Sequence, residues 1–104
     1  MTQSTNIPRS TRQNSTQEPA AEVEIYTSPH CGYCQHAKDL LDRKGVVYTE
    51  YGVLTDPSHR TRMLARSNGR TSVPQIFVNG VHIGGSDDLQ ALEQIGKLDA
   101  ILGL

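Results

Sequence analysis

The chain has 104 residues, which suits one small domain and is too short for two. Lys and Arg number 10 against 11 Asp and Glu, so the net charge is -1 and no basic excess is available to neutralise a nucleic-acid backbone. No apolar run approaches the ~20 residues that span a bilayer. We therefore expect a protein that binds neither nucleic acid nor a membrane.

The first 21 residues differ in composition from the rest of the chain. Ser, Thr, Asn and Gln fill most positions from 2 to 17, and Ile7 is the one apolar residue among them. Such a segment cannot bury enough apolar surface to offset the entropy lost on ordering, which predicts a disordered polar tail over 1–21. Arg9 and Arg12 suggest an organelle transit peptide as the alternative, but the missing apolar face favours the solvated tail.

A single domain over 22–104 begins with a predicted strand, turn, helix and second strand. Apolar and polar residues alternate in the strand, whereas the helix has apolar residues at three- and four-residue spacing. Gly45 suits the end of the helix, because glycine adopts the left-handed conformation readily. Strand, helix and strand in this order predict a parallel, right-handed βαβ unit. The expected ranges are 23–27 for the strand, 28–32 for the turn, 33–44 for the helix and 46–51 for the second strand.

The second half of the domain is predicted to form a helix, a β-hairpin and two further helices. Asn79–Gly80 between two short apolar runs is a strong hairpin signal. Asp56 or Ser58 suits the cap of the first helix, and the acidic residues in 86–88 suit the positive end of the next one. The expected ranges are about 57–67, 86–95 and 97–102 for the helices, and 75–78 and 81–84 for the strands.

These elements predict an α/β fold with a four-stranded mixed sheet flanked by helices. Its two cysteines, Cys31 and Cys34, fall at the junction between the first strand and the first helix. A bridge across two residues restricts the unfolded chain little, so the pair is better explained as chemistry than as a structural staple. A CxxC beside a βαβ pattern is typical of a thioredoxin-like redox motif. With no apolar signal segment ahead of the cysteines, we expect a cytoplasmic protein.

Cys31 is predicted to be the nucleophile and Cys34 the resolving thiol. Disulfides are attacked by the thiolate rather than by the thiol. Cys31 lies at the start of a helix, where unpaired N–H groups and the helix dipole favour negative charge, and the Cys34 thiol is placed to donate a hydrogen bond to its sulfur. Cys34 faces inward. His30 is either a second source of positive charge or an exposed turn residue, and the second interpretation is favoured because histidine is largely neutral at pH 7.

A mononuclear zinc site is the chemical alternative at this junction. His30, Cys31, Cys34 and His36 place two cysteines and two histidines within one short segment. Zinc sites of this class take their ligands from two knuckles separated by a further segment, and that spacing is missing here. We therefore expect no metal at this set. Apart from His30, the histidines of the chain are expected on the surface rather than at a site: His36, His59 and His82.

Two further segments have residues that suit the binding of a ligand. Pro74 is either an ordinary proline at the start of a strand or a cis proline that holds a loop edge open beside the cysteines. In the second case, the backbone N–H and C=O of Val73 are free to pair with an extended peptide. Ser86 or Asp87 suits a helix cap. The same helix start, preceded by glycines, also suits a carboxylate, and Asp87 suits an ammonium group, so together they fit an α-amino acid end.

The segments IYTSPHCGYCQHAKDLL and TSVPQIFVNGVHIGGSDDLQAL resemble the dithiol glutaredoxins, in particular their bacterial glutaredoxin three type. The resemblance covers about 23–102 and implies a thioredoxin fold, a monomer, and a role in electron transport and cell redox homeostasis. It implies glutathione as co-substrate, and protein disulfides and glutathione mixed disulfides as substrates. Carried over by position, the catalytic residues are Cys31 and Cys34, and the glutathione-binding residues are Tyr33, Ser72, Val73, a cis Pro74, Gly85, Ser86 and Asp87.

The chain departs from this family's pattern at two positions. Ser28 stands where many members carry a lysine that receives the glycyl carboxylate of glutathione. Arg60, Arg62 or Arg66 are candidates for that role, and the sequence does not choose among them. Gly32 stands where CPYC has proline, so the reduction potential is expected to shift from the family's roughly -200 to -230 mV.

Gly32 also leaves an alternative function open. Dithiol members without the proline resemble those that hold a [2Fe-2S] cluster between two subunits, with Cys31 and one glutathione thiol from each as ligands. A dimer is expected only in that case. A third possibility is a thioredoxin-like protein that ignores glutathione. The absence of tryptophan and the presence of Ser86 and Asp87 argue against it.

Overall fold

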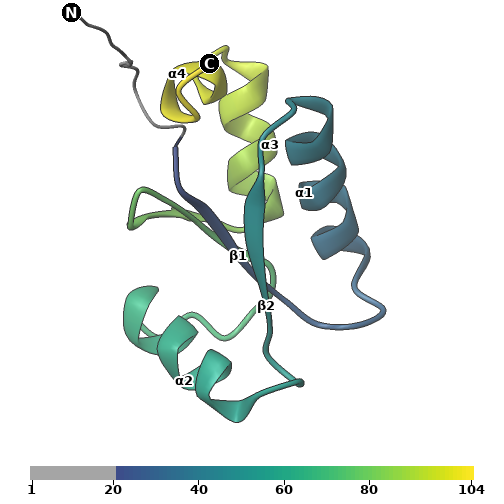
Figure 1. The fold of residues 1–104 in the computed structure, drawn as a ribbon, viewed down its shortest axis with the longest axis vertical. Helices are drawn as coiled ribbons and strands as arrows, with labels where there is room; N and C mark the ends of the chain where they lie inside the picture. Colours follow the sequence, from purple (N-terminus) through teal and green to yellow (C-terminus); the bar gives the residue numbers. More distant parts are fainter. Residues whose placement is uncertain (1–20) are drawn as a thin grey trace, which may run out of the picture.

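The computed structural model of the protein describes residues 21–104, so the tail predicted over 1–21 lies outside it apart from Ala21. Within these residues the chain forms one four-stranded sheet in the order β2-β1-β3-β4, with four helices (Figure 1). None of these helices is long and apolar enough to cross a membrane. The strands are β1 Val23–Thr27, β2 Tyr48–Gly52, β3 Gln75–Val78 and β4 Val81–Gly84, and the helices are α1 Gly32–Arg43, α2 Pro57–Arg66, α3 Ser86–Gln94 and α4 Leu98–Ile101.

The sheet is mixed, as the sequence predicts. β1 pairs in parallel with β2 and antiparallel with β3, and β3 pairs antiparallel with β4. Asn79 and Gly80, which join β3 to β4, both have the positive φ that a two-residue hairpin of this kind requires. Because the neighbouring strands β1 and β3 run in opposite directions, the last residues of β1 lie beside the first residues of β3 at one end of the sheet.

The two faces of the sheet bury different helices because side chains alternate along each strand. Figure 1 shows α1 and α3 side by side over one face, with α2 on the other side of the sheet. The main core, between the sheet and helices α1, α3 and α4, contains Val23, Ile25, Ala37, Leu40, Leu41, Ile76, Val78, Leu89, Leu98 and Leu102. The smaller core, beneath α2, contains Tyr26, Val53, Met63 and Phe77.

Element boundaries follow the predicted signals closely, with one clear shift. Gly45 takes a φ of +74 after the end of α1, and the Asp56 side chain caps α2 by accepting from the Ser58 amide at 2.9 Å. β2 begins at Tyr48 rather than at residue 46. Val47 is 88% exposed, and pairing with β1 starts only where Tyr48 lies opposite Val23, so two β-branched residues belong to the connection instead of the strand.

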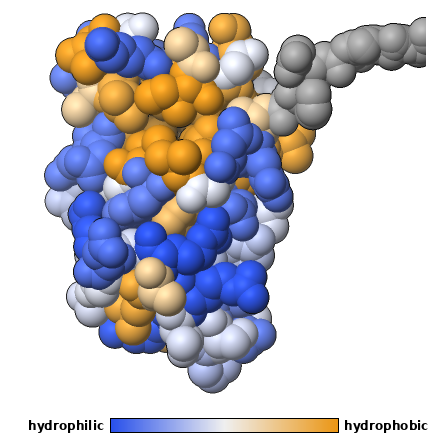
Figure 2. Space-filling model, turned by 90° about the vertical axis from the view of Figure 1, so that its left-hand side faces the viewer, coloured by the Kyte–Doolittle hydropathy of each residue, from blue (hydrophilic) through white to orange (hydrophobic). Residues whose placement is uncertain are grey.

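The surface differs between the two ends of the molecule. Figure 2 shows hydrophobic surface gathered toward the end that holds α4, whereas hydrophilic residues predominate toward α2. The loop that follows β1 and carries Cys31 lies toward the α2 end (Figure 1).

Candidate active site

Cys31 occupies the N-cap position of α1, directly after the loop that leaves β1. Its sulfur accepts a hydrogen bond from the backbone N–H of Cys34 at 3.2 Å, and its thiol lies 3.9 Å from the carbonyl oxygen of Val73. The Cys34 amide is thus a donor to this sulfur in addition to the Cys34 thiol that the sequence analysis expected. An N–H group of the first helical turn, which has no partner within the helix, is thus bonded to the sulfur.

Cys34 lies in a different environment one turn further along α1. Only 2% of it is exposed, and it faces the sheet together with Ala37, as predicted. Burial and, to a smaller extent, the hydrogen bond with Cys31 together raise the pKa of the Cys34 thiol to about 12. Both thiols are free. At neutral pH, therefore, Cys34 is a protonated, enclosed thiol beside a partly exposed Cys31.

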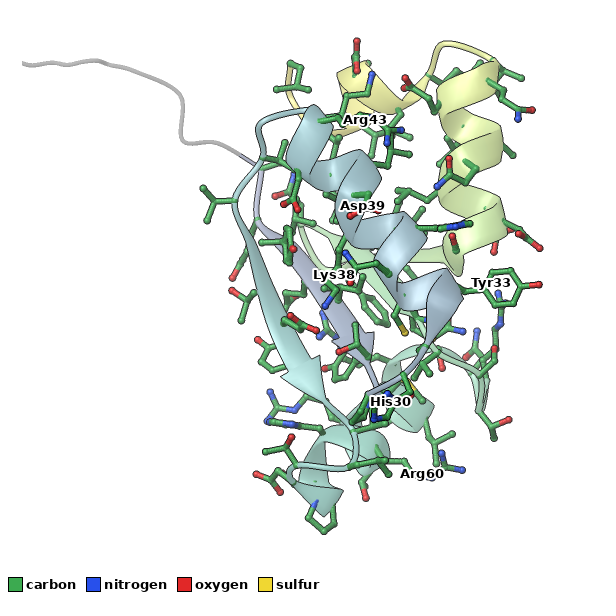
Figure 3. The ribbon with its side chains drawn as sticks, turned by 90° about the vertical axis from the view of Figure 1, so that its right-hand side faces the viewer. His30, Tyr33, Lys38, Asp39, Arg43 and Arg60 are labelled. Carbon is green, nitrogen blue, oxygen red and sulfur yellow. The ribbon has the colours of Figure 1, made fainter. Side chains whose placement is uncertain are left out.

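Of two pockets near Cys31, one is lined by this residue and the other by Val73, whose carbonyl oxygen lies 3.9 Å from the Cys31 sulfur. The larger, of about 730 Å³, is lined by both cysteines and by His30, Lys38 and Glu50 among others. Lys38 forms an ion pair with Glu50 at 3.0 Å and lies between α1 and β2 (Figure 3). Both thiols thus border a single open space.

The smaller pocket, of about 250 Å³, brings together three parts of the chain that are far apart in sequence: the start of α1, the loop before β3 and the start of α3. All seven residues that the resemblance assigns to glutathione line it. They are Tyr33, Ser72, Val73, Pro74, Gly85, Ser86 and Asp87.

The residues of the smaller pocket present both side chains and main chain to its interior. Tyr33 is 64% exposed and projects away from the start of α1 (Figure 3). The peptide bond between Val73 and Pro74 is cis, in agreement with the second interpretation of this proline. An added Cβ on Gly85 would lie 3.3 Å from the Pro74 carbonyl oxygen, so a side chain at this position would narrow the pocket.

The cap of α3 differs from the one expected. Gly85 is the N-cap residue, and its backbone N–H donates to Asp88 Oδ2 at 2.9 Å. The sequence analysis proposed Ser86 or Asp87 as the cap, which is wrong because the carboxylate three residues after Gly85 reaches back to the helix start. Neither Ser86 nor Asp87 is therefore needed to cap the helix.

Sequence analysis missed two charged residues of the smaller pocket, Arg70 and Asp88. Arg70 Nη1 lies 3.6 Å from Asp88 Oδ2, so the pocket wall carries an opposite-charge pair. Arg70 stands two residues before Ser72 in the sequence, and this closeness to the predicted binding loop could have indicated that Arg70 belongs to the pocket.

The three candidate arginines of α2 line neither pocket. Arg66 is committed elsewhere, since its guanidinium lies 2.8 Å from Glu24 Oε1 and donates to Tyr26 Oη at 2.9 Å. This pairing removes Arg66 as a partner for the glycyl carboxylate. Arg60 and Arg62 are exposed.

Two histidines expected on the surface are half-buried, so that expectation is wrong for them. His59 Nδ1 lies 2.8 Å from the Gly52 carbonyl oxygen and borders the larger pocket, and His82 Nε2 lies 2.6 Å from Gln75 Oε1. His30 and His36 are exposed. Over 21–104, no group of three or more His, Cys, Asp and Glu side chains is arranged to hold a metal ion.

Comparisons with known proteins agree with this site. The sequence profile of the Glutaredoxin family matches residues 23–83. Glutaredoxin 3 of Escherichia coli is 51% identical over 82 residues, which are 79% of this chain and 98% of that protein. The solution structure of a Brucella melitensis glutaredoxin is 51% identical, with a TM-score of 0.68 over 78% of this chain and 87% of the other.

A structural neighbour of lower sequence identity is a buckwheat glutaredoxin in complex with glutathione. It is 27% identical, with a TM-score of 0.73 over 80% of this chain and 77% of the other. These neighbours have the thioredoxin fold, and the sheet order and the CxxC at the start of α1 agree with it. The chain belongs to the glutaredoxin family.

Proposed function

We propose that the protein is a glutathione-dependent thiol–disulfide oxidoreductase that reduces protein disulfides and glutathione mixed disulfides. The observation that carries this proposal is the position of Cys31. Its sulfur accepts an amide hydrogen bond at a helix start and lies beside a pocket formed by all seven residues expected to bind glutathione.

The reaction with a glutathione mixed disulfide uses Cys31 alone. The Cys31 thiolate attacks the glutathionyl sulfur, a new disulfide forms, and the protein substrate leaves as a thiolate that takes up a proton. A second glutathione thiolate then attacks the glutathionyl sulfur bound to Cys31. Oxidised glutathione leaves, and the Cys31 thiolate is regenerated.

The reaction with a protein disulfide requires both cysteines. Cys31 attacks one sulfur of the substrate disulfide to form a mixed disulfide, and Cys34 then loses its proton and attacks the Cys31 sulfur. The substrate leaves as a dithiol, and two glutathione molecules reduce the resulting Cys31–Cys34 disulfide. The shared pocket supports this route, because both cysteines border the same open space.

In the proposed complex, glutathione lies extended across the smaller pocket. Val73 pairs main chain to main chain with the cysteinyl unit, Tyr33 flanks the groove, and Ser86 and Asp87 hold the γ-glutamyl end at the start of α3. Arg70 adds a positive charge to the same pocket.

Two variants test the proposed roles of the cysteines. In a glutathione-coupled assay, Cys34→Ser should retain reduction of a glutathionylated peptide but lose most reduction of a protein disulfide. Cys31→Ser should lose both. An active Cys31→Ser protein would contradict the assignment. If glutathione alone fails to reduce the oxidised wild-type protein, the thioredoxin-like alternative is favoured instead.

A second candidate function is a [2Fe-2S] cluster bound between two copies of the chain. The observation that favours it is Gly32, where an added Cβ would meet nothing within 4 Å, so open space lies beside the partly exposed Cys31 thiol. Cys31 and one glutathione thiol from each copy would supply the four thiolate ligands that such clusters take.

Anaerobic reconstitution with iron, sulfide and glutathione tests this candidate. A coloured dimer in visible absorbance and gel filtration would support it, and a colourless monomer would contradict it. Gly32→Pro is the matched variant, and we expect it to lose any cluster that the wild-type protein holds. Without a cluster, we propose that the protein acts as a monomer in the cytoplasm.

A further inference from the structure

A chain of hydrogen bonds runs from the edge strand β4 to the loop in front of Pro74. His82 Nε2 lies 2.6 Å from Gln75 Oε1, and Gln75 Nε2 donates to the Ser72 carbonyl oxygen at 3.0 Å and to Ser72 Oγ at 3.3 Å. Gln75 is fully buried, whereas Ser72 borders the smaller pocket. The chain therefore connects a strand outside that pocket to the main chain of its wall.

This geometry fixes the orientation of the Gln75 amide and the tautomer of His82. A carboxamide has one acceptor oxygen and one NH2 group. Because the NH2 group faces two oxygens of Ser72, Oε1 faces β4 and requires a donor there. With Gln75 at 0% exposure, bulk water does not reach this oxygen, so His82 must carry a proton on Nε2.

The surroundings of His82 keep its ring neutral. The ring packs against Phe77 with centroids 5.0 Å apart. Burial lowers the pKa of His82, the Arg70 guanidinium lowers it further, and the Asp88 carboxylate opposes both effects. Arg70 and Asp88 also border the smaller pocket, so the charges that act on His82 belong to the proposed glutathione site.

We propose that His82, acting through Gln75, is a positioning residue for glutathione binding, an inference that rests on the proposed function. Gln75 holds Ser72 so that the next residue, Val73, presents its backbone N–H and C=O to the extended tripeptide. Without a donor at position 82, the buried Oε1 has no partner. The amide then loses one of the contacts that fix its position, and its hydrogen bonds to Ser72 are weakened.

Two substitutions at His82 separate the hydrogen bond from the packing of the ring. His82→Leu removes the donor, whereas His82→Gln places an amide N–H near the position of Nε2. We expect His82→Leu to raise the KM for a glutathionylated peptide about fivefold, the effect of one lost hydrogen bond, with kcat changed less than about twofold. His82→Gln should restore the wild-type KM. His36→Leu, on the exposed face of α1, is the matched control and should leave both constants unchanged.

NMR of the reduced protein without glutathione gives a readout that does not depend on activity. The side-chain amide protons of Gln75 should exchange slowly with solvent in the wild-type protein and in His82→Gln, and rapidly in His82→Leu. Equal KM values for an active wild-type protein and His82→Leu would overturn the inference, as would rapid exchange in the wild-type protein. If His82→Leu does not fold, rapid exchange of the Gln75 amide protons in the wild-type protein would still overturn the inference, as would a raised KM for His82→Gln.

The proposed function fails by a different result from the inference. A wild-type protein that shows no glutathione-dependent activity would overturn the proposed function, and the exchange of the Gln75 amide would still test the hydrogen-bond chain on its own.

Discussion

Cys31 and Cys34 lie one helical turn apart, yet their reactivities should differ strongly. Cys31 is partly exposed and accepts an amide hydrogen bond, whereas burial raises the pKa of Cys34 to about 12. Thiolates react with alkylating agents and thiols do not. We expect iodoacetamide near neutral pH to place one adduct on the reduced protein, at Cys31, as located by peptide mass spectrometry. First modification at Cys34 would contradict these roles.

Gly85 lines the proposed ligand site, and a side chain at this position would enter the space between Pro74 and Arg70. A Cβ there would lie 3.3 Å from the Pro74 carbonyl oxygen and 3.8 Å from Arg70 Nη2. Extra atoms forced into a closely packed position typically cost about 1 to 3 kcal/mol of free energy. We therefore expect Gly85→Val to weaken glutathione binding by about that amount, measured by the KM for a glutathionylated peptide. Ala91→Val, on the exposed face of α3, is the control. Equal KM values for Gly85→Val and the control would place the ligand elsewhere.

At the scale of elements, the contact between α2 and β1 depends on Arg66 and Glu24. The two side chains are 24% and 13% exposed, and the guanidinium also lies 4.1 Å from the centre of the Phe77 ring. Removing one partner leaves a charge that is largely buried and unpaired. We expect Arg66→Met to lower the free energy of unfolding by about 2 to 4 kcal/mol in urea denaturation. A change below about 0.5 kcal/mol, typical of surface substitutions, would show that the pair is not structural.

The same pair should make stability depend on acid. The Arg66 guanidinium lowers the pKa of the Glu24 carboxyl below its ordinary 4.5, so the unfolded chain takes up this proton at a higher pH than the folded chain. The contribution of Glu24 is therefore present above about pH 4.5 and is lost as the pH falls through the folded pKa. Urea denaturation between pH 6 and 3 should show a steeper loss for the wild-type protein than for Glu24→Gln. Parallel curves would contradict this prediction.

Local sequence signals predicted most elements, because their causes are local. Asp56, Gly45 and Asn79–Gly80 act through their own backbone conformation or a side-chain contact within a few residues. The start of β2 was not predictable in this way, since pairing with Val23 decides it. For the same reason, the ion pair of Arg66 and the hydrogen bond of His82 became visible only in the folded chain. Among the pocket residues, Val73, Pro74, Ser86 and Asp87 were predicted from their chemistry as well as from the family resemblance, whereas Tyr33 and Ser72 were assigned by the resemblance alone.

At the scale of the whole molecule, the core indicates where the domain begins. Among residues 21–104, both core clusters lie between Ala21 and Leu102, and Glu22 is held by a hydrogen bond from its amide to Asn79 Oδ1 at 2.8 Å. We propose that residues 22–104 form the folded domain and that the preceding segment is a tail.

Deleting residues 1–20 tests this domain boundary. Because Ala21 packs against the main core, the shortened chain should begin there. We expect the Tm to change by less than about 3 °C, with glutathione-coupled activity retained. A Tm lowered by more than about 8 °C would show that the first residues contribute to the fold.

The two halves of the proposed site belong to the middle of the sheet. Cys31 follows β1 and Val73 precedes β3, and these neighbouring strands each have a hydrogen-bonded partner on both sides. Fraying of β2 therefore leaves the catalytic sulfur and the ligand-pairing backbone in register, whereas fraying of β4 also breaks the contact between His82 and Gln75. Amide hydrogens of the two inner strands should exchange only through global opening, so the pairing of β1 with β3 should persist until the whole domain melts.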